Sequence, residues 1–201
     1  IGTRLQDFTT GSWTVFGEET RIVGLNVARF DAAKHASHPL VADAREGLAE
    51  LSAALGDWHT GDSWRERARV EKDAFRAFVA ERTASAATGG TPTYAQGVGG
   101  INRLAGGSDL ALTSAGGLPG EINVNWLPKG VGTFDCEYGY STMGYEIAGA
   151  WGARMGRAEG EVIAFVGDGS YLMLNSELYS ATLAGHKLIV VLCDNGGYAV
   201  I

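Results

Sequence analysis

The sequence predicts an α/β fold in which parallel strands are buried between layers of helices. Residues 161–166 and 187–193, EVIAFV and KLIVVLC, are short and continuously apolar. Such runs are typical of parallel strands that are covered on both faces, and parallel neighbours need a crossover between them. The intervening segment predicts a helix from Ser170, as its cap, to about Ala184, because Gly185 stands where a helix commonly ends.

A polar, glycine-containing turn follows each of these strands. The first is Gly167-Asp168-Gly169 and the second is Asp194-Asn195-Gly196-Gly197. The carboxyl ends of neighbouring parallel strands lie at the edge where open α/β sheets bind ligands. Asp168 and Asn195 offer oxygen donors there, and the glycines allow main-chain groups to approach closely. The pattern indicates a Mg²⁺ that keeps phosphate oxygens as further ligands, with the amino end of the following helix facing the same anion.

The first part of the chain predicts a βα piece followed by a charged helix. Ile1–Thr10 is expected to be a strand end with its loop, and Arg21–Ala28 the next strand. Pro39–Leu55 has the apolar spacing of a helix that ends at Gly56. A longer helix is expected from Asp62 to about Ala87. Its basic residues alternate with acidic ones, as on a solvated helix face.

The second part resumes the α/β pattern after a break at Thr88–Pro92. Tyr94–Ala105 is expected to form a short helix and Asp109–Ala115 a strand. The segment Gly116–Glu121 predicts a glycine-rich turn that suits anion contact through backbone amides. A helix rich in small residues follows, from Gly144 to about Ala153, and its small side chains allow close packing on the sheet.

Composition narrows the function classes. The 201 residues carry a net charge of −7, which argues against a nucleic-acid binder, because such a protein needs a concentrated basic face. Cys136 and Cys193 are far apart and form no CxxC pair, which favours buried thiols in a reducing compartment. No signal peptide and no apolar run of membrane length is visible in the sequence, so a soluble, cytoplasmic protein is expected.

The two turns together resemble the cofactor motif of thiamine diphosphate (ThDP) enzymes, in which GDG is followed after roughly 25 residues by an asparagine that closes a strand. The resemblance implies that the side chains of Asp168 and Asn195 and the carbonyl of Gly197 bind Mg²⁺. It implies that Met143 is the apolar wedge that bends the cofactor, while the Met143 amide and the Ser141 carbonyl meet the aminopyrimidine. The residues expected to contact the cofactor are Gly116, Gly117, Leu118, Ser141, Met143, Gly167, Asp168, Gly169, Ser170, Asn195, Gly197 and Tyr198.

Within that family, IGTRLQDFTTGSW, GTFDCEYGYSTMGYEIAGAWGA and VGDGSYLMLNSEL resemble the hydrolases of myo-inositol breakdown that open trihydroxycyclohexane-1,2-dione to 5-deoxyglucuronate. Gly196 departs from that pattern, where a larger residue is expected. The resemblance implies the end of a middle domain (1–56), a helical linker (57–91) and most of a diphosphate-binding domain (92–201), so that the chain reads as an internal piece of a longer protein.

The same resemblance implies a homodimer or homotetramer with the cofactor between subunits. The activating glutamate of these enzymes belongs to a domain outside the 201 residues, so no catalytic residue is assigned and the piece alone is expected to be inactive. Two alternatives stay open. The metal and wedge residues would equally serve an acetolactate-synthase-like enzyme or a 2-oxo-acid decarboxylase. A non-catalytic Rossmann-like binding module is the alternative from another class, although no GxGxxG follows a strand. A P-loop NTPase is disfavoured because the sequence has no Gly-Lys pair.

Overall fold

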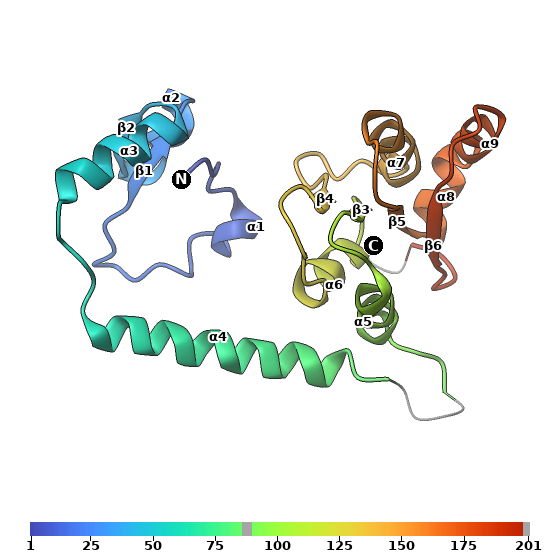
Figure 1. Cartoon of the computed structure of the whole chain (residues 1–201), viewed down its shortest axis with the longest axis horizontal. Helices are drawn as coiled ribbons and strands as arrows, with labels where there is room; N and C mark the ends of the chain where they lie inside the picture. The colour runs from blue at the N-terminus through green and yellow to red at the C-terminus, as the bar shows by residue number, and fades with distance from the viewer. Residues whose placement is uncertain (86–89, 199–201) are drawn as a thin grey trace. The chain divides into compact units, whose positions relative to one another are not determined.

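The computed structural model describes residues 1–85 and 90–198 of the chain (Figure 1). The chain divides into two compact units, Ile1–Arg65 and Glu66–Ile201. The charged helix expected to reach about Ala87 already ends at Arg82. Residue 87 itself, the start of the break at Thr88 and the residues after Tyr198 lie outside the described residues. The assignment of the units to the domains of a larger enzyme stays a prediction.

The first unit contains a pair of parallel strands, in which Leu25 lies opposite Leu40. Gly24 lets the chain pack closely, because a Cβ there would lie 2.4 Å from the carbonyl oxygen of Ala32. The elements of this unit are α1 (Asp7–Thr10), β1 (Val23–Asn26), α2 (Arg29–Ala32), η1 (Lys34–Ala36), β2 (His38–Val41) and α3 (Ala44–Leu55).

Two predictions for this unit were wrong. The segment Ile1–Thr10 ends in the short helix α1 instead of a strand. Residues 38–41 form β2, so the helix expected from Pro39 begins only at Ala44. The side chain of Asp43 explains that boundary, because its carboxylate accepts hydrogen bonds from the amides of Arg45 and Glu46 and so caps α3. The end of α3 at Gly56 was predicted correctly.

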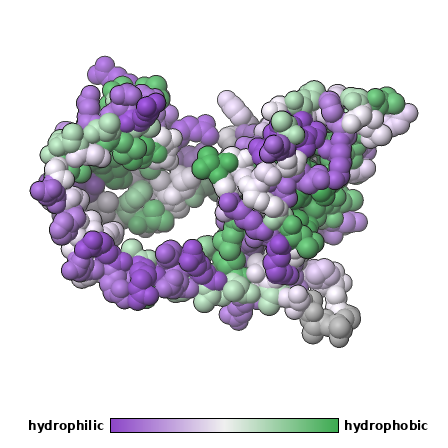
Figure 2. Space-filling view, viewed as in Figure 1, coloured by the Kyte–Doolittle hydropathy of each residue, from purple (hydrophilic) through white to green (hydrophobic). Residues whose placement is uncertain are grey.

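Helix α4 (Asp62–Arg82) is the predicted charged helix, and its surface is hydrophilic along most of its length (Figure 2). Arg69 pairs with Glu66 at 2.6 Å and with Asp73 at 3.2 Å, and all three side chains are more than half exposed. Exposed pairs of this kind contribute little to stability, because water and salt screen them. The basic residues of α4 therefore belong to a solvated helix face, as predicted.

The second unit is built on a parallel sheet, and the predicted α/β class is confirmed. Its strands lie in the order β4-β3-β5-β6, and each neighbouring pair is parallel. The strands are β3 (Leu110–Thr113), β4 (Phe134–Cys136), β5 (Val162–Gly167) and β6 (Ile189–Cys193). The helices are α5 (Tyr94–Leu104), α6 (Leu118–Asn125), α7 (Tyr145–Gly156), α8 (Asp168–Leu174) and α9 (Ser176–Leu183).

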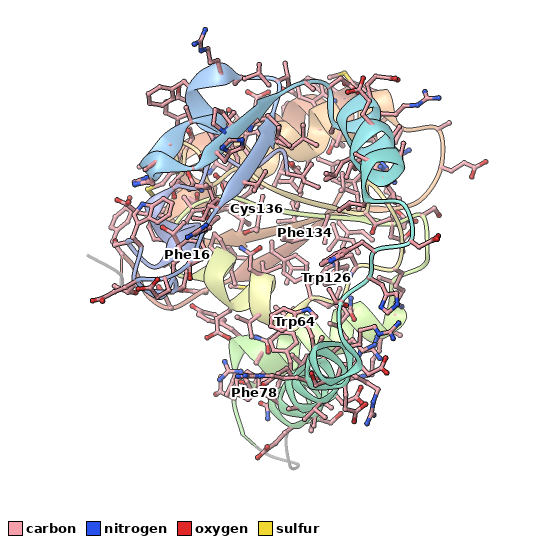
Figure 3. All side chains as sticks on the ribbon, turned by 90° about the vertical axis from the view of Figure 1, so that its left-hand side faces the viewer. Phe16, Trp64, Phe78, Trp126, Phe134 and Cys136 are labelled. Carbon is pink, nitrogen blue, oxygen red and sulfur yellow. The ribbon has the colours of Figure 1, made fainter. Side chains whose placement is uncertain are left out.

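Helices cover both faces of this sheet. Along β5, Ile163 and Phe165 belong to one apolar cluster with residues of α5 and α6. The alternate residues Val162 and Ala164 belong to another cluster with Ala150 of α7. This alternation follows from the two-residue period of a strand. Trp126 packs edge-on against Phe165 at the centre of the first cluster, and Phe134 packs against the same cluster (Figure 3).

Three details of the second unit differ from the sequence prediction. The segment expected to be one helix consists of α8 and α9, and α8 begins at Asp168, before the predicted cap Ser170. The residues of β6 are only partly buried, because β6 is the outermost strand of the sheet among the described residues. The turn expected to reach Glu121 ends at Gly117, since Pro119 suits the first turn of a helix and α6 begins at Leu118.

None of the helices that the structure describes is both long enough and apolar enough to cross a lipid bilayer.

Candidate functional site

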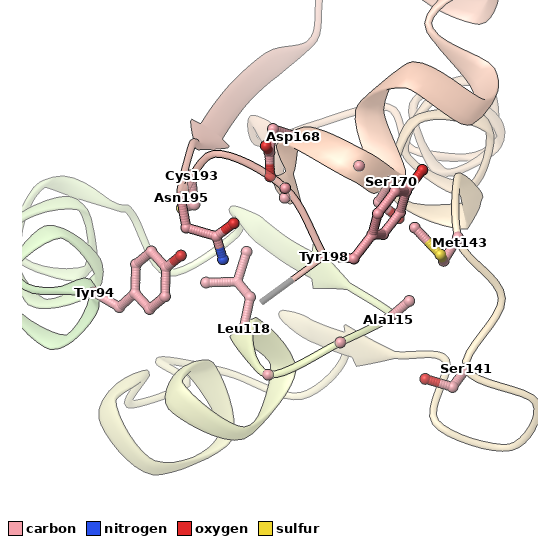
Figure 4. A pocket seen from close by; sticks show the side chains of 15 residues that line it. Tyr94, Ala115, Leu118, Ser141, Met143, Asp168, Ser170, Cys193, Asn195 and Tyr198 are labelled. Atoms are coloured by element: carbon pink, nitrogen blue, oxygen red, sulfur yellow. The ribbon is translucent and has the colours of Figure 1, made fainter. Parts of the chain in front are cut away.

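The candidate site lies where the connections of the sheet diverge. After β3 the chain passes through α6 into β4, which pairs with one side of β3. The later strand β5 pairs with the other side of β3. In open α/β sheets this divergence leaves a crevice at the carboxyl ends of the two central strands. A cavity of about 300 Å³ opens there, a size at the lower end of ligand pockets (Figure 4).

Every residue that the sequence predicts to contact a cofactor lines this one cavity. They come from the ends of β3 and β5, from the turn after β6, and from the segment between β4 and α7 (Figure 4). The cavity-lining residues are Tyr94, Ala115, Gly116, Gly117, Leu118, Ser141, Met143, Gly167, Asp168, Gly169, Ser170, Cys193, Asn195, Gly197 and Tyr198. The structure therefore brings the predicted residues together, while their roles toward a cofactor stay predictions.

Asp168 and Asn195, the candidate metal ligands, reach the cavity from adjacent strands. Asp168 directly follows β5 and Asn195 follows β6, and Gly167 and Cys193 at the ends of these strands are paired. The turn after β6 is held by Asp194, whose carboxylate accepts a hydrogen bond of 2.9 Å from the Gly196 amide. Among the described residues no group of three His, Cys, Asp or Glu side chains could hold a metal ion.

Gly169 has a specific steric role at the start of α8. A Cβ at this position would lie 2.6 Å from the ring of Tyr198. Glycine at this position therefore lets the Tyr198 ring lie directly against the first turn of α8. This close approach brings the two predicted cofactor loops to the same wall of the cavity.

The segment that carries Ser141 and Met143 is held by buried and half-buried polar groups. Glu137 accepts hydrogen bonds from the amides of Thr142 (3.0 Å) and Tyr140 (2.9 Å), and these donors, with Thr142 the stronger, lower the pKa of Glu137. The hydroxyl of Ser114 donates to the carbonyls of Glu137 and Thr142. Ser141 itself adopts φ = 54°, a left-handed conformation that needs such support.

Several residues of the site were not predicted from the sequence. Tyr94 and Cys193 line the cavity, and burial raises the pKa of the Cys193 thiol, so this group stays protonated at neutral pH. Glu146 lies beneath the cavity and is almost completely buried. An acidic residue within the run of small and apolar residues GYEIAGA was a readable signal, because a buried carboxylate needs hydrogen-bond donors around it.

Comparison with known proteins agrees with this arrangement. Residues 121–201 match the family model "Thiamine pyrophosphate enzyme, C-terminal TPP binding domain", TPP being another abbreviation for ThDP. The whole chain is similar to proteins named 3D-(3,5/4)-trihydroxycyclohexane-1,2-dione hydrolase. It is 35% identical over 221 residues to the one from Geobacillus thermodenitrificans and 38% identical over 226 residues to the one from Listeria monocytogenes serovar 1/2a.

These alignments cover 100% of the chain but 34% and 35% of the respective relatives. The chain thus spans about a third of the length of the curated relatives that it matches.

Proposed function

Because residues 121–201 belong to the family of C-terminal TPP-binding domains of thiamine pyrophosphate enzymes, we propose that this chain is part of a ThDP- and Mg²⁺-dependent hydrolase. Its reaction is the hydrolytic cleavage of a C–C bond in trihydroxycyclohexane-1,2-dione, giving 5-deoxyglucuronate in myo-inositol breakdown. The observation that carries the proposal is the single cavity lined by every predicted cofactor contact. The names of relatives that are similar along the entire chain support the substrate assignment.

The donor set of the cavity fits a magnesium ion. Mg²⁺ prefers hard oxygen ligands and in nucleotide-like sites combines one or two protein carboxylates with phosphate oxygens. The carboxylate of Asp168 and the amide oxygen of Asn195 have this chemistry and line the same wall as Gly197, whose carbonyl is the third proposed ligand. Of the two polar side chains in this turn, Asn195 lines the cavity, whereas the carboxylate of Asp194 accepts the Gly196 amide.

The remaining lining fits a cofactor with both a charged and an apolar part. Gly116 and Gly117 bring the main chain after β3 directly to the cavity, and Gly116 adopts φ = 83°, which a residue with a side chain rarely does. Leu118, Met143 and Tyr94 add apolar surface beside these polar groups. We assign the diphosphate to the glycine-containing turns and the ring system to the region of Met143.

Bound ThDP supplies an electron sink for the carbanion that forms when a C–C bond next to a carbonyl is cleaved. The residues of this chain hold and orient the group. Asp168, Asn195 and Gly197 would hold the metal, whose charge would offset that of the diphosphate, and Met143 would lie against the ring system of the cofactor. Gly169 and the ring of Tyr198 lie against each other in one wall of the cavity.

The complete protein is proposed to act as a homodimer or homotetramer in the cytoplasm, with the cofactor between subunits. A second subunit then supplies the glutamate that activates the aminopyrimidine. Measuring the mass of the complete protein by light scattering, with and without ThDP and Mg²⁺, tests the assembly.

The metal assignment is tested by calorimetric titration of the complete protein with ThDP in the presence of Mg²⁺. Asp168→Ala should weaken binding by more than about a hundredfold, because even partners of metal ligands are worth about 10- to 100-fold in affinity. The matched control is Glu159→Gln, which changes an exposed acidic side chain and should bind like the unmodified protein. Equal ThDP affinity for Asp168→Ala and the control would refute the metal site.

The substrate assignment is tested by incubating the loaded protein separately with the cyclic dione and with pyruvate. Release of 5-deoxyglucuronate from the dione supports the proposal. Turnover of pyruvate alone would favour the acetolactate-synthase-like or decarboxylase alternative. Binding of NAD or ATP in place of ThDP would favour a non-catalytic Rossmann-like module.

A further inference from the structure

The first turn of α7 contains a buried acidic residue for which the proposed function has no role. The Glu146 side chain is 1% exposed, although ionisable side chains of this type are seldom fully buried without partners. Glu146 is the second residue of α7. It is not among the described residues that line the cavity. Glu146 therefore lies behind the wall of the cavity and does not reach its interior.

Each oxygen of this carboxylate accepts hydrogen bonds from a different part of the cavity wall. Oε1 accepts from the Ala115 amide at 3.0 Å, and Oε2 accepts from the Gly144 amide at 3.1 Å. The Ser170 hydroxyl lies 3.0 Å from Oε1 and 2.9 Å from Oε2 and donates to the carboxylate. Ser170 Oγ in turn accepts from the Gly144 amide at 2.9 Å.

These donors belong to segments that are far apart in the sequence. Ala115 follows β3, Gly144 precedes α7, and Ser170 lies in the first turn of α8 after β5. Ala115 and Ser170 themselves line the cavity, and Gly144 is the neighbour of Met143, which also lines it. One buried carboxylate thus connects the three segments that carry the proposed contacts of the diphosphate and of the ring system.

The bond to Gly144 also fixes the orientation of the proposed wedge. A trans peptide group is planar, so its N–H and C=O point in opposite directions. With the Gly144 N–H directed at Glu146 and Ser170, the Met143 carbonyl of the same peptide must point away from them. Gly144 has φ = 91°, and a Cβ there would lie 2.9 Å from Leu174, so the turn has little freedom to find another arrangement.

We propose that Glu146 is a positioning residue that locks the ends of β3 and β5 and the Met143 segment into the geometry of the binding cavity. Its effect on ThDP rests on the proposed function, but the lock itself is a property of this chain. Since Glu146 acts on backbone amides and one hydroxyl, its loss should loosen these segments locally and leave the core of the sheet intact.

The test uses the complete protein with Glu146→Gln, which keeps the shape of the side chain but replaces one accepting oxygen with an NH₂ donor. Amide hydrogen exchange is measured by mass spectrometry without cofactor, and ThDP affinity is measured by calorimetry with Mg²⁺. Glutamine keeps one accepting oxygen, so either the Ala115 amide or the Gly144 amide loses its carboxylate acceptor, while Gly144 keeps Ser170 Oγ as an acceptor. Loss of this connection should speed amide exchange in the three segments, by roughly tenfold or more at the amide that has lost its acceptor. ThDP affinity should fall by a similar factor, while Glu159→Gln should change neither.

A second variant keeps the test decisive if Glu146→Gln does not fold. Ser170→Ala removes only the hydroxyl and leaves the Ala115 and Gly144 amides with their carboxylate acceptor. Its faster exchange should be confined to the segments around Gly144 and the start of α8, with the Ala115 amide unchanged.

The possible results separate the two proposals. Exchange that is faster in the three segments but unchanged in β5 supports the lock. Unchanged exchange in all segments, or a uniform increase that includes β5, overturns it, because the residue would then be either dispensable or only a general contributor to stability. If the unmodified protein does not bind ThDP, the proposed function fails, while the exchange pattern still decides whether Glu146 locks the cavity.

Discussion

At the scale of single residues, Asp109 shows how one carboxylate can join two parts of the second unit. Its oxygens accept hydrogen bonds from the Glu161 amide at 2.8 Å and from the Gly106 amide at 2.6 Å. These bonds connect the turn before β3 with the start of β5. The Glu161 amide is the largest cause of a lowered pKa of Asp109, followed by the Gly106 amide, and the cations of Lys129 and Arg157 add to it.

Replacing Asp109 with Asn should lower the free energy of unfolding by about 1–2 kcal/mol at neutral pH, since hydrogen bonds to charged groups are worth about 1.5–3 kcal/mol. Because the folded pKa is lowered, this stabilisation is present above the unfolded pKa of about 3.9 and is lost as the pH falls through the folded value. The difference between the unmodified chain and Asp109→Asn should therefore persist at pH 5–8 and shrink below about pH 4.

Urea unfolding of both chains, followed by tryptophan fluorescence at several pH values, measures this difference. The exposed Glu159→Gln serves as the control and should leave the unfolding free energy within about 0.5 kcal/mol. A difference for Asp109→Asn that stays constant from pH 7 to pH 3.5 would contradict the assigned role of the carboxylate.

At the scale of elements, α5 shows how a capping box can offset a glycine content that disfavours a helix. The helix contains Gly97, Gly99 and Gly100, and glycine disfavours helix by roughly 1 kcal/mol per residue. A capping box compensates at its start, where the Thr93 hydroxyl accepts the Gln96 amide and the Gln96 side chain accepts the Thr93 amide. Gly99 is also required by packing, because a Cβ there would lie 2.3 Å from the Thr83 Cβ.

Thr93→Ala should therefore reduce the free energy of unfolding by about 1 kcal/mol, the typical value of a lost N-cap. Thr93→Ser retains the hydroxyl and should behave like the unmodified chain. Thermal unfolding followed by circular dichroism compares the two variants. Equal midpoints for Thr93→Ala and Thr93→Ser would show that the capping box does not stabilise α5.

The elements that were predicted well from the sequence are those whose boundaries depend on residues close to them along the chain. The strand at Val162–Gly167 and the end of α3 at Gly56 follow from an apolar run and a glycine. Residues 39–43 were assigned wrongly, because Leu40 and Val41 fit a helical period as well as a strand. The pairing of β2 with β1, a contact between distant residues, decides between the two, and spacing along the chain does not contain that information.

The residues of the candidate site divide in the same way, into those predictable from nearby sequence and those that depend on contacts between distant segments. Asp168 and Asn195 could be placed because each stands at the end of a recognisable strand. Glu146 carries a sequence signal of burial, an acidic residue in an apolar run, but its hydrogen-bond partners come from distant segments. Tyr94 likewise reaches the cavity only through the folding of distant segments. Ser170 was expected to contact the cofactor, and that contact stays a prediction. Its hydroxyl donates to Glu146, a partner that only the three-dimensional arrangement reveals.

At the scale of the whole molecule, the second unit depends on a sheet that holds two helical layers together. Phe165 is fully buried on the face covered by α5 and α6, where it contacts Trp126 with a centroid separation of 5.6 Å. The neighbouring residues Ala164 and Val166 face the opposite layer. Loss of a large side chain from β5 would consequently open a cavity at the centre of the unit.

Phe165→Ala should lower the free energy of unfolding by about 3–5 kcal/mol, the usual cost of removing a buried aromatic ring. Leu172→Ala removes an apolar side chain that is 68% exposed and should cost less than about 0.5 kcal/mol. Urea titrations of the two variants give both values. A similar loss for both would mean that Phe165 is not part of a tightly packed core.

The strand order β4-β3-β5-β6 also has a kinetic consequence. Leu110 pairs with Val162, and the walls of the cavity are complete only after β6 has joined β5. Contacts between such distant residues form late, because closing long loops costs entropy before any contact is gained. A small molecule held in the finished cavity should therefore slow the unfolding rate of the chain and leave its refolding rate nearly unchanged.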